Sequence, residues 1–182
     1  GRELAVQLNA QGCDLFLCDI NEARLSETAS LLSSDRGAID CKVVDCGVRA
    51  EIIHWAESIS QHRSHVDAVF NNAGVAYGAL FEESTDENYE WLMNINFWGV
   101  VWASRAFLPL LKAAPVGHLV NLSSIFGMVG ISTQSAYNAS KFAVRGFTEA
   151  LQAEYRGSQL KISCVHPGGI ATNIARRART DG

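Results

Sequence analysis

Short apolar segments alternate with segments of helical periodicity along the chain, and this alternation constrains the fold more than any other feature. The apolar segments have the length of strands and comprise residues 14–18, 41–44, 66–70, 118–122 and 161–165. The helical segments comprise residues 2–11, 49–61, 86–112 and 135–155, with one more that Asn21 can cap. Strands that alternate with helices in this way predict a parallel sheet with helices on both faces.

Polar or turn residues follow each apolar segment directly. They are Asp19, Asp45, Asn71 with Asn72, Ser123 with Ser124, and Pro167 with Gly168. Parallel strands end at one edge of their sheet, and ligands of such sheets bind outside the carboxyl ends. The sequence therefore predicts a ligand-binding α/β domain.

Composition and charge exclude several other classes. The 182 residues are 48% hydrophobic and 19% charged, and we expect one globular domain over residues 1–182, because no repeat or linker divides them. The net charge of −4 argues against a nucleic-acid or anionic-membrane binder. Residues 113–140 contain no Asp, Glu, Lys or Arg, but proline, glycine and asparagine interrupt them, so we expect no membrane span.

Cysteine and histidine spacing favours neither a disulfide framework nor a metal site. The five cysteines include no CxxC pair, and the five histidines include no HExxH motif. The cysteines therefore favour a reducing compartment, and we expect a cytoplasmic location without a signal peptide. The chain starts at a helix with no strand before it, and we expect it to be incomplete at both ends.

An ordered set of motifs resembles the short-chain dehydrogenase/reductase family over essentially the whole chain. The set consists of Asn-Asn-Ala-Gly at residues 71–74, a serine, Tyr-Asn-Ala-Ser-Lys at residues 137–141, and Pro167-Gly168 followed by Thr172. A YxxxK motif alone would be weak, but the order and spacing of the whole set are specific. The resemblance implies a Rossmann-type, doubly wound domain that exchanges a hydride between a nicotinamide cofactor and a secondary alcohol or ketone.

Tyr137 and Lys141 are four residues apart and therefore share one face of the predicted helix. A free tyrosine has a pKa of ~10, and a nearby cation would lower it. The resemblance implies that Tyr137 is the acid/base group and that Lys141 also binds the nicotinamide ribose. The alternative is an exposed tyrosine and a solvated lysine on an amphipathic helix.

The resemblance implies two further catalytic residues, and each has a neighbour that competes with it. Ser124 lies about thirteen residues before the tyrosine and would bind the substrate oxygen, while Ser123 would cap local backbone. Asn96 precedes Phe-Trp-Gly, as the family's helix asparagine does; it would distort the helix and hold a water linked to Lys141. Asn94 would be a surface or packing residue.

The resemblance also implies the cofactor-binding residues. Asn72, Ala73 and Gly74 would lie against the adenosine ribose, and Asp45 would contact adenine, although a helix N-cap role for Asp45 is an alternative. Pro167, Gly168, Ile170 and Thr172 would close over the nicotinamide, with the Ile170 backbone at the carboxamide. Gly1 would be the last glycine of the phosphate loop. Asp19 would accept bonds from the adenosine ribose, so we expect NAD rather than NADP.

Two sets of apolar residues predict the chemical class of the substrate and the oligomeric state. The segment between Ser124 and Tyr137 would line a pocket for a hydrophobic alcohol or ketone with Ile125, Phe126, Met128, Val129 and Ile131. We expect the helices at residues 86–112 and 135–155 to pair in a homodimer or homotetramer through Trp98, Val101, Trp102, Phe107, Phe142, Val144 and Phe147.

Two alternatives from other classes stay open. The first is a dinucleotide-binding regulatory or scaffold protein without turnover, against which the complete Ser124, Tyr137 and Lys141 set argues. The second is an anion-binding module that uses Arg176, Arg177 and Arg179, for which a solvated helix face is the competing interpretation.

Overall fold

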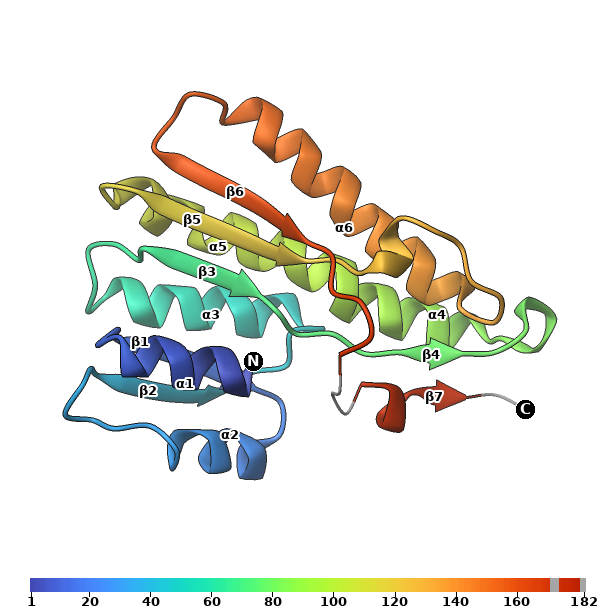
Figure 1. The fold of residues 1–182 in the computed structure, drawn as a ribbon, viewed down its shortest axis with the longest axis horizontal. Coiled ribbons are helices and arrows are strands. Elements are labelled where there is room, and N and C mark those ends of the chain that lie inside the picture. The colour runs from blue at the N-terminus through green and yellow to red at the C-terminus, as the bar shows by residue number, and fades with distance from the viewer. Residues whose placement is uncertain (171–173, 181–182) are drawn as a thin grey trace. The chain divides into compact units, whose positions relative to one another are not determined.

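A computed structural model describes residues 1–170 and 174–180, so Thr172 lies outside the described residues. The chain divides into two compact units, Gly1–Cys46 and Gly47–Gly182, and each is considered by itself (Figure 1). That residues 1–182 form a single dinucleotide-binding domain stays a prediction.

The first unit contains two helices and a pair of parallel strands. The helices are α1 (Arg2–Ala10) and α2 (Glu22–Ala29), and the strands are β1 (Leu15–Asp19) and β2 (Ile39–Val43). The strands pair from Leu15 opposite Ile39 to Asp19 opposite Val43. Asn21 caps α2 as expected, since its side chain accepts a bond from the Arg24 amide at 3.0 Å.

The second unit carries a three-stranded parallel sheet in the order β3-β5-β6. Its strands are β3 (Ala68–Asn71), β5 (Gly117–Leu122) and β6 (Leu160–Val165), with a short pair formed by β4 (Tyr77–Gly78) and β7 (Arg179–Thr180). Its α-helices are α3 (Arg49–Ser60), α4 (Asp86–Met93), α5 (Gly99–Ala113) and α6 (Ser135–Glu154). The 3₁₀ turns are Phe81–Glu83, Ile125–Gly127 and Ala175–Arg177.

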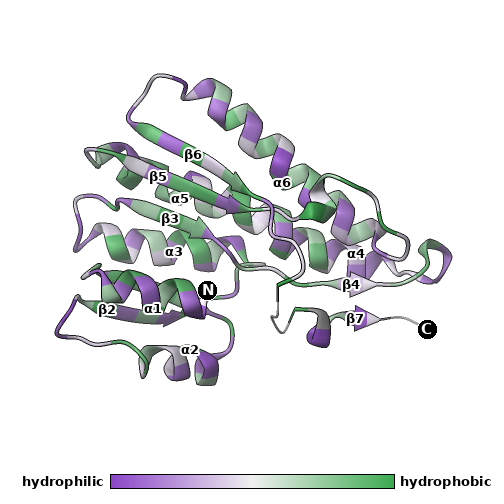
Figure 2. Ribbon diagram, viewed as in Figure 1, coloured by the Kyte–Doolittle hydropathy of each residue, from purple (hydrophilic) through white to green (hydrophobic). Residues whose placement is uncertain are grey.

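Apolar side chains hold these helices on the sheet. Helix α5 packs against β3 and β5, α6 packs against β5 and β6, and α3 packs against α5. Leu111, Leu119 and Leu160 form a buried cluster between the layers. Figure 2 shows hydrophobic and hydrophilic bands alternating along α6, as an amphipathic helix requires. The α/β class, the parallel strands and the Rossmann-type arrangement are confirmed.

The structure corrects two expectations. The helix expected over residues 86–112 is interrupted by a π-helical turn at Asn94–Trp98, which separates α4 from α5. Arg179 is not on a solvated helix face: it belongs to β7, its guanidinium lies 3.7 Å from the Trp91 ring centroid, and it donates to Asn88 Oδ1 at 2.9 Å. Strands of two residues, such as β4 and β7, are too short to produce a periodic pattern.

None of the described helices is both long enough and apolar enough to pass through a membrane. Within residues 1–170 and 174–180, no three His, Cys, Asp or Glu side chains are placed to hold a metal ion.

Candidate active site

The loops that follow β5 and β6 run side by side at the carboxyl edge of the sheet. The Ser123 amide donates to the Val165 carbonyl at 2.8 Å, and the Ile125 amide donates to the Pro167 carbonyl at 3.0 Å. The His166 ring Nδ1 lies 3.2 Å from the Ser124 carbonyl. These bonds extend the pairing of the two parallel strands beyond their ends and bring Pro167 next to Ser124.

Tyr137 and Ser124 meet at this edge. Burial raises the pKa of Tyr137, and hydrogen bonding to the Ser124 side chain acts in the opposite direction. The Phe126 ring stands edge-on to Tyr137, with centroids 6.1 Å apart. Tyr137 is half-buried on the first turn of α6, so its hydroxyl is held in place and stays protonated at neutral pH.

The two serines divide their roles differently from the expectation. Ser124 also performs the local capping expected of Ser123, because its Oγ accepts a bond from the Phe126 amide at 3.1 Å. Ser123 is buried and donates to the Lys141 carbonyl at 2.8 Å. Gly127 packs against this bond so closely that an added Cβ would lie 2.3 Å from Ser123 Oγ. Ser123 therefore links the loop after β5 to α6 by a hydrogen bond, and Ser124 remains the serine that interacts with Tyr137.

Lys141 is buried, with 4% of its surface exposed. Burial lowers the pKa of its ammonium to about 8, and an electrostatic interaction with Cys164 acts in the opposite direction. Its Nζ donates to the Leu122 carbonyl at 3.0 Å and lies 5.6 Å from the centroid of the Tyr137 ring.

The expected effect of Lys141 on the pKa of Tyr137 is not found. Burial and the Ser124 hydrogen bond set that pKa, and the lysine charge is not among its causes. The ammonium donates to the Leu122 carbonyl, and its Nζ lies 5.6 Å from the centroid of the Tyr137 ring.

Asn96 lies in the π-helical turn and is fully buried. Its Oδ1 accepts from the Val75 amide at 2.8 Å, and its Nδ2 donates to the Val75 carbonyl at 2.9 Å and to Ser140 Oγ at 3.2 Å. The helix is therefore distorted at this asparagine, as expected, and the side chain ties the loop after β3 to α6. A water held between Asn96 and Lys141 stays a prediction. Asn94 is exposed, in line with a surface role.

Asn138 is a site residue that the sequence reasoning missed. It is buried on α6 beside Tyr137. Its Nδ2 donates to the carbonyls of Phe126 and Val129 at 2.6 and 2.7 Å, and its Oδ1 accepts from the Ile131 amide at 3.0 Å. Asn138 thus fixes the whole loop between Ser124 and the helix. The signal was the same as for Asn96, namely an asparagine inside a helix, where this residue is unfavourable.

A buried polar network supports the floor of the site. Asn71 donates to Asn121 Oδ1 at 2.8 Å and to Ser104 Oγ at 3.1 Å, and Asn121 donates to Thr148 Oγ1 at 3.0 Å. No buried side-chain nitrogen or oxygen of the described residues lacks a hydrogen-bond partner. Such a satisfied network links β3, β5, α5 and α6 and fixes their register.

Among the cofactor residues predicted in this unit, Gly74 lies close to Lys141. A Cβ at Gly74 would lie 3.4 Å from Asn96 Oδ1 and 3.6 Å from Lys141 Nζ, so the backbone there comes close to both side chains. Asn72, Ala73, Gly168 and Ile170 are exposed. A Cβ at Gly168 would meet no atom within 4 Å, which leaves room for a ligand beside Pro167.

The cofactor residues predicted in the first unit lie near one another. Asp19 is exposed, accepts from the Asn21 amide at 2.8 Å, and acts electrostatically on the Gly1 amino group. Asp45 is half-buried. The N-cap residue of α3 is Val48, so the alternative N-cap role for Asp45 is wrong.

The donor set fits a nicotinamide nucleoside. An ammonium has three protons, and the structure records one bond from Lys141, to Leu122, which leaves donors for two ribose hydroxyls. The Tyr137 hydroxyl stands on the same helix face, and the backbone near Gly74 is close enough to confine the ligand.

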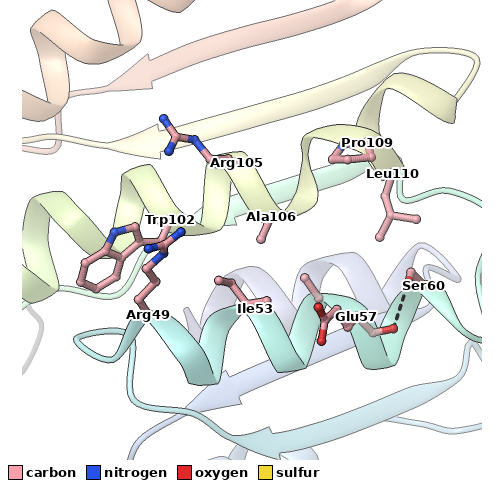
Figure 3. A pocket seen from close by; sticks show the side chains of 10 residues that line it. Arg49, Ile53, Glu57, Ser60, Trp102, Arg105, Ala106, Pro109 and Leu110 are labelled. Atoms are coloured by element: carbon pink, nitrogen blue, oxygen red, sulfur yellow. Dashed lines mark hydrogen bonds between the residues drawn. The ribbon is translucent and has the colours of Figure 1, made fainter.

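A groove of about 380 Å³ lies apart from these residues, between α3 and α5 (Figure 3). None of the predicted catalytic or cofactor residues lines it. Its walls are Arg49, Ile53, Ala56, Glu57, Ser60, Trp102, Arg105, Ala106, Pro109 and Leu110.

A parallel α/β fold with a serine, a tyrosine and a lysine grouped at its strand ends defines the class, and comparison defines the family. The family model for short chain dehydrogenases matches residues 1–182, and the chain belongs to this family. A Mycobacterium tuberculosis protein named "Putative oxidoreductase SadH" is 41% identical over 180 residues. The match covers 98% of this chain but 65% of that protein, so the chain spans less than two thirds of its relative.

Solved structures agree with this assignment. A short chain dehydrogenase/reductase of Burkholderia phymatum in complex with NAD superimposes with a TM-score of 0.90 and 29% identity, over 97% of this chain and 65% of the other. An Escherichia coli protein complexed with NADPH superimposes with a TM-score of 0.88 and 29% identity. The match covers 97% of this chain and 74% of the Escherichia coli chain.

Proposed function

We propose that the protein is a nicotinamide-dependent oxidoreductase that interconverts a secondary alcohol and a ketone. The observation that carries this proposal is the grouping of Ser124, Tyr137 and the buried Lys141: Lys141 Nζ lies 5.6 Å from the Tyr137 ring centroid, and the Ser124 side chain acts on the pKa of Tyr137. Three groups able to hold or move a proton stand together where a parallel sheet ends, and the family to which the chain belongs supports the same chemistry.

The cofactor would be held by the residues that the family resemblance assigns to it. Lys141 and Tyr137 would bind the nicotinamide ribose, and Pro167, Gly168 and Ile170 would enclose the nicotinamide. Asn72, Ala73 and Gly74, with Gly1, Asp19 and Asp45, would bind the adenosine side; Thr172, outside the described residues, would also contribute. When bound, the nicotinamide supplies or accepts the hydride.

The chain's own residues would handle the oxygen and the proton. Ser124 Oγ and Tyr137 Oη would both bond the substrate oxygen and fix its position. In reduction, Tyr137 donates its proton to the developing alkoxide, which its hydroxyl and that of Ser124 stabilise. Because the raised pKa keeps Tyr137 protonated at neutral pH, the acid form needed for reduction is already present.

The decisive experiment uses the whole protein with NAD, NADP and their reduced forms, and a panel of secondary alcohols and ketones. Substrate-dependent change in nicotinamide absorbance is the expected result. Cofactor binding without turnover on any substrate would favour the dinucleotide-binding scaffold instead. Salt-sensitive anion binding that survives replacement of Tyr137 would favour the anion-binding module.

The substrate of this reaction would be hydrophobic. Ile125, Met128, Val129 and Ile131 are each at least 41% exposed, although all four are apolar. They lie in the loop that Asn138 fixes next to Tyr137. An exposed apolar lining beside the catalytic hydroxyl supports a ring system or an acyl chain as the group next to the carbonyl. The odd number of cysteines, with no CxxC pair among them, supports a cytoplasmic location.

We expect NAD to be preferred over NADP, and Asp19→Ala to reduce that preference. The Asp19 carboxylate would repel a 2′-phosphate by ~1–4 kcal/mol at about 4 Å, which corresponds to roughly one to three decades in kcat/KM. Arg2 does not compensate, because its guanidinium is paired with Glu27 at 2.6 Å. The measurement is the ratio of kcat/KM for the two cofactors.

The control for this ratio is Asp35→Ala, which removes an exposed carboxylate of the same unit. Its ratio should equal that of the wild type. A wild-type preference for NADP, or an unchanged ratio in Asp19→Ala, would remove Asp19 from the cofactor site.

We expect a homodimer or homotetramer formed through α5 and α6. Trp98 and Phe142 are 45% and 42% exposed, and Trp98 stacks on Trp102 with centroids 6.2 Å apart. Phe107 and Val144, which the sequence pattern added to this face, are buried in the core. Light scattering at micromolar concentration should give a multiple of the monomer mass, and Trp98→Arg should lower it. Phe81→Arg, at an exposed aromatic outside these helices, should leave the mass unchanged.

A further inference from the structure

Gln134 directly precedes α6 and stands one helical turn before Tyr137. It is the N-cap residue of the helix, and its side chain forms no capping hydrogen bond. Its carbonyl accepts a helical bond from the Asn138 amide at 2.7 Å, so the helical spacing already applies to it. Residues three apart on a helix lie on one face, with Cβ atoms about 5–6 Å apart. The chain therefore places a carboxamide beside the phenol of Tyr137.

The carboxamide of Gln134 lies against the backbone of β4. A Cβ added at Gly78 would lie 2.8 Å from Gln134 Nε2 and 4.0 Å from Gln134 Cδ. The amide group therefore occupies space that a side chain at residue 78 would need. Tyr77, next to Gly78, is buried in one cluster with Ala136, and Tyr137 packs against this cluster. Gly78, Gln134 and Tyr137 thus belong to one region of the molecule.

The hydrogen-bonding groups of the Gln134 side chain are unused within the described part of the chain. A glutamine side chain has two donor protons and an acceptor oxygen. The structure records no hydrogen bond to them among residues 1–170 and 174–180, although Gln134 is half-buried. In that part of the chain no buried side-chain nitrogen or oxygen lacks a partner, so the amide atoms of Gln134 are open to solvent and to a ligand.

The backbone just before Gln134 is strained. Thr133 has a φ of 65°, in the left-handed region that a β-branched residue rarely adopts. Two hydrogen bonds fix this turn: the Ala79 amide donates to the Thr133 carbonyl at 3.0 Å, and the Gln134 amide donates to the Ile131 carbonyl at 3.2 Å. Backbone strain that is maintained by surrounding contacts clusters at ligand-binding and active sites. The strain therefore supports a functional role for the residue that this turn presents.

We propose that Gln134 is a substrate-binding residue that selects ketones with a second oxygen close to the reacting carbonyl. This inference rests on the proposed function, which places the reacting oxygen at Ser124 and Tyr137. The separation of about 5–6 Å between neighbouring Cβ atoms corresponds to a chain of about four bonds, as between the two carbonyl oxygens of a 3-oxo ester. Gln134 Nε2 would donate to the second oxygen, and the apolar loop that Asn138 fixes would contact the hydrocarbon parts.

The amide would select against simple ketones as well as for oxygenated ones. A ketone with only hydrocarbon at this position would cover the amide of Gln134, remove its water and offer no partner in return. Leaving a buried polar group unsatisfied costs more than a hydrogen bond contributes, so sites built to bond a polar group reject analogues that lack it. Gln134 would therefore set the preference between two ketones of equal size.

The test compares the reduction of ethyl 3-oxooctanoate and 6-undecanone by the whole protein with the reduced cofactor. The two ketones have main chains of equal length and the reacting carbonyl in the same place, but 6-undecanone lacks the second carbonyl. The measured quantity is the ratio of kcat/KM for the ester to kcat/KM for 6-undecanone. Gln134→Met keeps the length of the side chain and removes the amide, so it should lower this ratio about tenfold. A loss of activity on both ketones with the wild-type ratio would make Gln134 purely structural and would overturn the inference.

Gly78→Ala tests the same site without replacing Gln134. The added Cβ would lie 2.8 Å from Gln134 Nε2, so the flexible amide must move away, and the ratio should fall as in Gln134→Met. Gln61→Met is the matched control, because it removes an exposed carboxamide at the end of α3. Its ratio should equal that of the wild type. A wild-type ratio in Gly78→Ala would contradict the placement of the amide at the substrate.

Binding of the ester separates this inference from the proposed function. Titration calorimetry with ethyl 3-oxooctanoate uses the protein with oxidised NAD or NADP, which cannot reduce the ketone. The wild type should bind the ester about ten times more tightly than Gln134→Met. If the wild type reduces no ketone but this difference in affinity is found, the proposed function fails and Gln134 remains a binding residue. Equal affinities would overturn the role of Gln134, whether or not turnover is observed.

Discussion

Tyr137→Phe is expected to lower kcat by about 10²–10⁴-fold, the usual contribution of a positioned acid/base group. The phenyl ring keeps its edge-on contact with Phe126, so packing is preserved. The lost hydrogen bond to Ser124 should cost only ~1 kcal/mol of unfolding free energy. NAD affinity should change little. Steady-state kinetics, cofactor titration and urea unfolding of the variant measure these three effects.

The pH dependence of the wild type should follow from the raised pKa of Tyr137. Reduction uses the protonated hydroxyl, so its rate should stay constant through neutral pH and fall as the pH rises through that pKa. Oxidation uses the deprotonated form, so its rate should rise over the same interval. Both dependences should disappear in Tyr137→Phe.

Tyr155→Phe is the matched control. Tyr155 follows the last residue of α6, at the far end of the helix that begins near Tyr137, and its ring packs in the Leu111 cluster. Its kinetics and pH profile should match those of the wild type. Turnover near the wild-type level in Tyr137→Phe would refute the acid/base role.

Lys141→Met is expected to lower turnover and cofactor affinity and yet stabilise the fold at pH 7. The pKa of Lys141 falls from 10.5 to about 8 in the folded chain, which corresponds to ~3 kcal/mol of instability at neutral pH. Methionine has a similar volume and carries no charge to bury. Loss of the bond to the Leu122 carbonyl destabilises the variant by ~1 kcal/mol. We therefore expect the free energy of unfolding to rise by a net ~1–2 kcal/mol.

The sign of the pH effect follows from proton binding. Between pH 8 and 10.5 the unfolded chain holds the lysine proton while the folded chain releases it, so wild-type stability rises with pH across this interval. The advantage of Lys141→Met should therefore be complete below pH 8 and should vanish near pH 10.5. Urea unfolding at several pH values measures this difference.

Lys112→Met replaces an exposed lysine of α5 and is the control. Its free energy of unfolding should show neither the increase expected for Lys141→Met nor the pH dependence of that increase. Unchanged cofactor affinity in Lys141→Met would remove the proposed ribose contact. A variant less stable than the wild type at pH 7 would show that the Leu122 bond outweighs the burial of the ammonium.

Local patterns in the sequence were sufficient for the class of fold and for the family, and the candidate site residues that they predict stay a prediction. Alternating apolar and amphipathic segments depend only on neighbouring residues, so they predict strands and helices within one or two residues of their ends. The four-residue spacing of Tyr137 and Lys141 places both on one helix face in any α-helix. Their order with Asn-Asn-Ala-Gly and Pro-Gly along the chain identified the family before any contact was known.

Only the tertiary structure determined the burial, the hydrogen-bond partners and the pKa values of those residues. The pKa of Lys141 depends on burial and on Leu122, which lies in β5, and the pKa of Tyr137 depends on Ser124 in another loop. Asn96 distorts its helix because Val75 and Ser140, remote in sequence, bond its side chain. Periodicity reports which face of an element is buried, but not which distant group lies opposite, and desolvation and hydrogen bonding depend on that group.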